Sequence, residues 1–175
     1  MVEPSAIIHA SMNTLLWEAA IMTVCIGCVD LGWGKNDPRD LGIVLLAGAL
    51  LETIALCFVL ANGNALDATI AAAFILALWY LGFAMTLGKT NRLVMVHANM
   101  LTGLLFFLFT VWAAINTHVF LAIALGLLVP VLWGGSLAHY TGNPKGAKIA
   151  GIAAFVDSFV FTFMAFCGAI GVSLP

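Results

Sequence analysis

The sequence predicts an all-α membrane protein, in which six transmembrane helices form three helical hairpins around a pore and both termini lie outside the cytoplasm. Three observations support this fold class. The chain has six apolar stretches of about 20 residues, the length that crosses a hydrocarbon core of roughly 30 Å at about 1.5 Å per residue. Its 175 residues are 63% hydrophobic and 8% charged. All six Lys and Arg residues fall in three short loops, which are every second connection between the apolar stretches.

The apolar stretches define one six-helix domain over residues 1–175. We expect helices near 10–30, 41–61, 66–88, 93–115, 119–138 and 148–171. Each is bounded by segments rich in turn-forming residues. The basic connections read GWGKNDPRD, GKTNR and HYTGNPKGAK, and the other two are the short runs at 62–64 and 116–118.

The three basic loops set the predicted topology. Their pairs are Lys35 with Arg39, Lys89 with Arg92, and Lys145 with Lys148. Cytoplasmic loops carry the excess of Lys and Arg, so these loops are predicted to face the cytoplasm. The first lysines of the pairs follow at intervals of 54 and 56 residues, which suggests one hairpin repeated three times, with an axis that can be a pore.

Three acidic residues, Glu18, Glu52 and Asp157, fall deep within the predicted helices, roughly 12–15 Å from the helix ends. An acidic group at the bilayer centre costs about 2.5–3.5 kcal/mol, so each is expected to face protein or water and is a candidate functional residue. No Lys or Arg lies at that depth, so the neutral carboxyl is favoured. The alternative role is a structural hydrogen bond from the protonated carboxyl to a neighbouring helix.

Several uncharged polar and aromatic residues are further candidates for a pore. Trp17, Trp79 and Trp133 lie inside the predicted helices, where an indole can face lipid, pack between helices or narrow a pore. Asn13 and Asn99 are the amides that would meet a carboxylate if the chain transported one.

Other function classes are not supported. A net charge of −2 argues against a nucleic-acid partner. The sequence has no nucleotide loop, zinc motif or nucleophile elbow, so we expect neither an enzyme nor a bound metal or cofactor. Cys25 and Cys28 form a CxxC inside an apolar stretch, which is more typical of packing than of redox chemistry. Residues 1–5 carry no basic region or cleavage site, so we expect the first helix to be retained.

Nearly the whole chain resembles the acid-activated urea channels and the amidase-associated amide transporters. The resemblance is carried by LGWGKNDPRDLGIVLLAGAL (31–50), WYLGFAMTLG (79–88), and VLWGGSLAHY through GIAAFVDSFV (131–160). It implies that Trp133 is a pore-constricting tryptophan and Asp157 a pore carboxylate. A second constriction tryptophan of that family is replaced by Val129, and the long histidine-rich outer loop is absent, which puts acid gating in doubt.

The segment GIVLLAGALLETIALCFVLANGN (42–64) is also similar to the related acetate and succinate permeases, although EPSAIIHASMN (3–13) lacks most of their N-terminal motif. Both families imply a homo-hexameric ring, each protomer with its own pore, in a prokaryotic inner membrane.

These observations favour a passive channel for small uncharged polar solutes such as urea and short-chain amides, with ammonia as a further candidate. One alternative is a proton-linked permease for acetate or another monocarboxylate, in which Glu52 or Asp157 exchanges the proton. The other is a helical subunit of a larger membrane complex that transports nothing itself.

Overall fold

The computed structural model describes residues 4–33, 37–61, 63, 65–88 and 91–174. Within these residues the chain forms six α-helices, and each lies close to a predicted one. Their bounds are α1 Pro4–Asp30, α2 Pro38–Ala61, α3 Ala65–Leu87, α4 Arg92–Ile115, α5 Val119–Thr141 and α6 Pro144–Ala169. The largest differences from the predictions are the earlier starts of α1 and α6.

The polar loop residues explain where the helices begin. Asn143 caps α6, because its side chain accepts a hydrogen bond from the Lys145 amide and Pro144 follows at the first helical position. The same arrangement starts α2, where Asp37 Oδ1 accepts the Arg39 amide at 2.9 Å. An apolar pattern does not detect such caps, so the sequence placed the start of α6 at residue 148.

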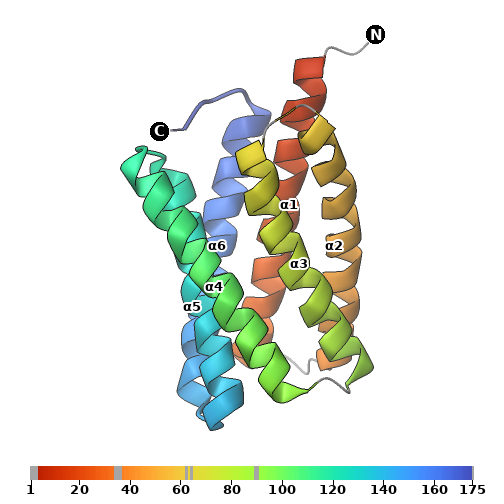
Figure 1. The fold of residues 1–175 in the computed structure, drawn as a ribbon, viewed down its shortest axis with the longest axis vertical. Helices are drawn as coiled ribbons and strands as arrows, with labels where there is room; N and C mark the ends of the chain where they lie inside the picture. The colour runs from red at the N-terminus through yellow and green to blue at the C-terminus, as the bar shows by residue number, and fades with distance from the viewer. Residues whose placement is uncertain (1–3, 34–36, 62, 64, 89–90, 175) are drawn as a thin grey trace.

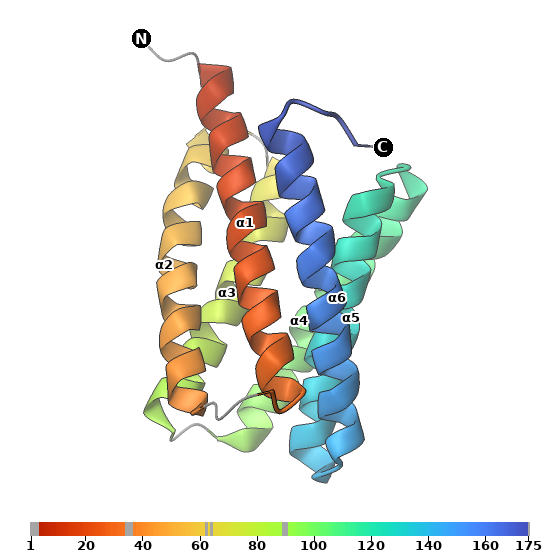
Figure 2. The same cartoon turned by 180° about the vertical axis from the view of Figure 1, so that it is seen from behind.

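The six helices form one bundle, in which successive helices run in opposite directions. Figures 1 and 2 show both termini at one end, together with the α2–α3 and α4–α5 turns. The helix ends that the other three connections join lie at the opposite end, and in the sequence these connections carry all the Lys and Arg residues. We call the two ends the terminal end and the basic end. Lys35, Lys89, Asn62 and Asn64 lie outside the described residues.

The helices are not packed with equal closeness. The most extensive contacts join α1 to α6, α4 to α5, α2 to α3, and α5 to α6, whereas α3 and α4 touch least among helices that are consecutive in the sequence. Of the three predicted hairpins joined by basic loops, only α5–α6 is therefore among the closest pairs. The threefold hairpin repeat stays a prediction.

Glycine makes the closest helix contacts possible. A methyl group added at Gly42 in α2 would lie 2.9 Å from the carbonyl oxygen of Gly82 in α3. One added at Gly134 in α5 would lie 2.8 Å from the carbonyl oxygen of Gly146 in α6. Backbones that approach this closely gain van der Waals contact, which holds helices together where lipid supplies no hydrophobic driving force.

All six helices are long and apolar enough to cross a membrane. Large apolar side chains cover the outside of the bundle, for example Leu76, Leu101 and Ile152, which are 62%, 70% and 58% exposed. A monomeric water-soluble protein rarely exposes apolar surface so extensively. The structure therefore indicates an integral, multi-pass membrane protein whose outer surface contacts lipid.

The α5–α6 contact predicts opposite effects for two adjacent glycines. Gly134→Ala should lower stability by about 1–3 kcal/mol, because its methyl group meets backbone atoms of α6 that cannot move aside. Gly135→Ala meets nothing within 4 Å and should be neutral or stabilising by about 0.5–1 kcal/mol. Thermal unfolding of both variants in detergent, followed by circular dichroism, measures the difference. Equal midpoints would mean that α5 and α6 are not this close.

Candidate functional site: two cavities on the bundle axis

Two cavities lie inside the bundle, one toward each end. The terminal-end cavity has a volume of about 90 Å³ and is lined by residues from all six helices. The basic-end cavity has a volume of about 70 Å³ and is lined by α1 to α5. The lining of the first runs along α3 from Asp67 to Phe74, and that of the second from Phe74 to Met85. The cavities therefore follow one another along the bundle.

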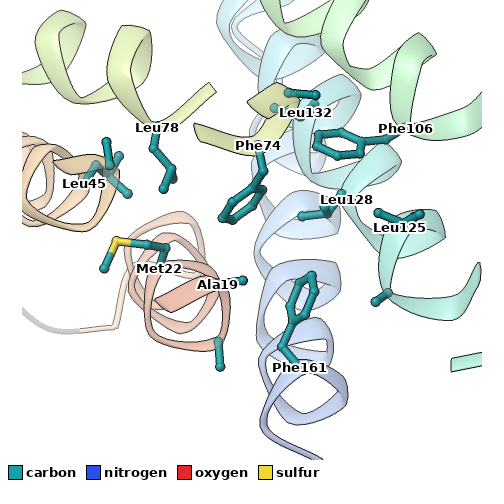
Figure 3. Close-up of a cluster of buried hydrophobic side chains, with 14 of the residues drawn as sticks. Ala19, Met22, Leu45, Phe74, Leu78, Phe106, Leu125, Leu128, Leu132 and Phe161 are labelled. Atoms are coloured by element: carbon teal, nitrogen blue, oxygen red, sulfur yellow. The ribbon is translucent and has the colours of Figure 1, made fainter. Parts of the chain in front are cut away.

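Three side chains line both cavities and so separate them: Phe74 from α3, Phe106 from α4 and Leu128 from α5. Phe74 lies edge-on to Phe106 with ring centroids 6.4 Å apart, and 6.3 Å from the ring of Phe161 in α6. Figure 3 shows Phe74 projecting from α3 into the middle of the bundle, with these residues around it. We call Phe74, Phe106, Phe161 and Leu128 the central constriction.

The central constriction is tightly packed. Phe106 is 1% exposed and Leu128 is 3% exposed, and both belong to the main hydrophobic core. Aromatic rings in this edge-on arrangement are favourable partners beyond the area that they bury. Apolar constrictions of this kind in membrane proteins exclude ions and water.

Each cavity has its own polar groups. Glu52 and Asp67 contribute to the lining of the terminal-end cavity. Glu52 is 1% exposed, and its Oε1 atom has no hydrogen-bond partner among the described residues. Thr23, Asp30 and Asn99 contribute to the lining of the basic-end cavity. Each cavity thus has a few polar groups in a largely apolar lining, which is typical of small-molecule sites.

Two of the eight predicted site residues, Glu52 and Asn99, line a cavity. Glu18 lies at the level of Glu52, because Met22 of α1 faces Gly48 of α2 and the helices run antiparallel. One turn from that contact brings Glu18 opposite Glu52. The structure therefore places two of the three deep acids near one another, on neighbouring helices.

Asp157 is completely buried near the middle of α6 and is absent from both cavity linings. Neither of its carboxyl oxygens has a hydrogen-bond partner within the described part of the chain. Gly27 of α1 lies against Gly151 and Phe155 of α6, which puts Thr23 at about the level of Asp157. Its predicted role as a pore carboxylate is untested by this placement.

The three tryptophans and Asn13 lie between helices or on the outside. Trp133 in α5 donates its indole N–H to the Met100 carbonyl at 3.1 Å and packs on Gly103, both in α4. Trp79 donates to Thr53 Oγ1 at 3.2 Å. Trp17 is 42% exposed. The side chain of Asn13 lies against Gly168, between α1 and α6. The pore roles of these four residues stay predictions.

Sequence reasoning missed the central constriction. Phe74 follows the run Ala71-Ala72-Ala73. A single large ring after three small residues is the one feature of the sequence from which Phe74 could have been predicted. Phe106 is one of three phenylalanines within four residues, and composition does not tell which of them faces inward. Which side of α4 is buried depends on its neighbours, and these are known only in three dimensions.

Comparison of the chain with models of protein families, with curated proteins and with solved structures finds no match.

The placement of Trp133 makes its role testable. Trp133→Ala removes an indole from a helix interface and should lower stability by about 3–5 kcal/mol, whereas Trp17→Ala, at an exposed position, should change stability little. Trp133→Phe keeps most of the packing, so its stability should lie between those of the other two variants. Thermal unfolding of the three variants ranks their stabilities. A pore-constricting role would appear instead as changed solute selectivity with near-normal stability.

Proposed function

We propose that this protein is a passive membrane channel for small uncharged polar solutes, with urea and short-chain amides as its substrates and ammonia as a further candidate. The observation that carries the proposal is the pair of cavities on either side of the central constriction. In this proposal, the two cavities and the central constriction between them form a path through the bundle with a single barrier.

The composition of this path accounts for selectivity. A solute that enters the central constriction must lose its water, and Phe74, Phe106 and Leu128 offer no polar group in exchange. An ion pays far more for that loss than an uncharged molecule, so it is excluded. Glu52 on one side and Asn99 on the other supply hydrogen bonds just before and just after the barrier.

The resemblance to the urea and amide channels supports the same function and extends it to the setting. In this proposal, the basic end faces the cytoplasm of a prokaryotic cell and both termini face outward. The protein forms a homo-hexamer in the inner membrane, because identical subunits usually assemble with closed symmetry and their apolar sides must be covered by lipid or by one another.

A second function, a proton-linked monocarboxylate permease, is favoured by one specific observation. Glu52 lines the terminal-end cavity with a buried, unpartnered carboxyl oxygen, so a proton carried by this group would travel beside the solute. The remaining alternative is a helical subunit that transports nothing itself. It would be favoured if the purified protein conducted no solute at all.

Opening the central constriction should raise flux. We expect Phe74→Ala to increase acetamide and urea flux several-fold and to reduce discrimination between them, because the narrowest part of the path loses a ring. Phe83→Ala is the matched control, since Phe83 lies on the same helix but is 48% exposed. Stopped-flow swelling of proteoliposomes measures both variants. Unchanged flux in Phe74→Ala, with the bundle still folded, would place the solute path elsewhere.

Replacement of Glu52 separates the two transport functions. Glu52→Gln keeps the size and hydrogen-bonding capacity of the side chain but cannot exchange a proton. For a passive channel we expect acetamide flux within about twofold of the parent. For a proton-linked permease, acetate uptake driven by a proton gradient should be lost. Asp157→Asn is the comparison variant, because the Asp157 carboxyl is buried in α6 but lines neither cavity. Loss of acetate uptake in this variant alone would assign the proton to Asp157.

A further inference from the structure

The basic-end cavity holds hydrogen-bonding groups of both kinds. Asn99 enters its lining from α4, and Asp30 from the last residue of α1. Asn99 is 6% exposed and so is nearly enclosed. An amide supplies N–H donors and a carboxyl supplies acceptor oxygens, so this cavity offers both within a volume of about 70 Å³.

The amide of Asn99 is held in one orientation by Tyr80. The Tyr80 hydroxyl donates to Asn99 Oδ1 at 2.7 Å, and Thr102 Oγ1 lies 3.4 Å from the same hydroxyl. These contacts also link α3 to α4, which have the fewest contacts of any two consecutive helices. Because Oδ1 is engaged, the free end of the side chain is Nδ2, which has two N–H donors and no acceptor.

We propose that the basic-end cavity binds solutes that carry a carbonyl oxygen and an N–H group on the same carbon, namely primary amides and urea. Asn99 Nδ2 donates to the carbonyl oxygen of the solute, and the Asp30 carboxyl accepts its N–H. The inference rests on the proposed function and names the site at which that function becomes selective.

The two cavities differ in this respect. The acidic side chains lining the terminal-end cavity are Glu52 and Asp67, and no amide side chain joins them. A carboxylate solute in the basic-end cavity would bring two acceptor oxygens and no N–H toward Asp30. Asn99 would be the amide donor for both of these oxygens. The arrangement thus disfavours acetate relative to acetamide, although the two molecules are nearly the same size.

The size of the cavity agrees with a ligand of this class. A single water needs about 10–15 Å³ of cavity volume of this kind, so a cavity of about 70 Å³ accommodates a molecule of a few heavy atoms. A longer or branched amide would have to displace Leu78, Leu81 or Leu132, which line the same cavity. Short-chain amides are therefore preferred within the class.

The test compares acetamide with ethylene glycol, an uncharged solute of similar size that has no carbonyl oxygen and no N–H. Proteoliposomes containing the full-length protein are mixed with each solute, and swelling rates give the flux ratio. Asn99→Leu should lower the acetamide to glycol ratio about 5- to 10-fold, the effect of one lost hydrogen bond to a solute. Tyr80→Phe should lower it about two- to threefold, because the amide of Asn99 is then free to turn.

Thr102→Val is the matched control, because it changes the other neighbour of the Tyr80 hydroxyl without touching the cavity lining. Its flux ratio should equal that of the parent. Tyr80→Phe scarcely alters side-chain volume, so it keeps the test valid if Asn99→Leu folds poorly.

Two results overturn the inference in different ways. If the parent protein conducts acetamide but Asn99→Leu and Tyr80→Phe leave the ratio unchanged, or lower both fluxes equally, the basic-end cavity is not the selective site and the channel function stands. If the parent liposomes swell no faster than empty ones with either solute, the proposed function fails and the inference fails with it.

Discussion

The interior of a membrane offers no hydrogen-bond partner for a peptide group, and the rest of this structure depends on that constraint. Six long helices satisfy the backbone within each crossing. Hydroxyl side chains along them bond to their own helix: Thr53, Thr110 and Thr162 each donate to the carbonyl four residues earlier. The carboxyls of Glu52 and Asp157 cannot be satisfied in this way, and both are turned into the protein. Many of the large apolar side chains face outward.

Lipid is as apolar as leucine, so burying leucine against leucine does not by itself drive the helices together. Close backbone approach at glycine does so, and it is distributed unevenly. Gly42 and Gly82 bring α2 against α3, and Gly134 and Gly146 bring α5 against α6. Between α3 and α4 the bonds from Tyr80 and the edge-on contact of Phe74 with Phe106 replace such an approach. The central constriction and the polar lining of the basic-end cavity both involve this boundary, which has the fewest contacts of any between consecutive helices.

A solute path through such a bundle needs a barrier that rejects ions and places that hold an uncharged solute. In the proposed channel, the two requirements are met by different side chains. Phe74, Phe106 and Leu128 form the barrier at the point where residues of five or more helices converge. Glu52 and Asn99 lie on opposite sides of it. Separating the apolar barrier from the polar binding groups lets selectivity change at one place without opening the other.

The sequence alone determined the number of helices, nearly all their ends and the grouping of the Lys and Arg loops, because these depend on local hydrophobicity and loop charge. It also drew attention to Glu52 and Asn99, which line the two cavities, since a polar residue deep in an apolar stretch stands out against its neighbours. Only the tertiary structure decided which helices pack together and which ring of several faces inward. Trp133 stands out in the sequence as strongly as Glu52, yet it bonds to Met100 across a helix interface, whereas Phe74 is inconspicuous in the sequence and lies at the constriction. The reason is physical: apolar side chains serve equally well toward lipid, between helices or along a path, and their direction is set by the neighbouring helices and not by their own chemistry.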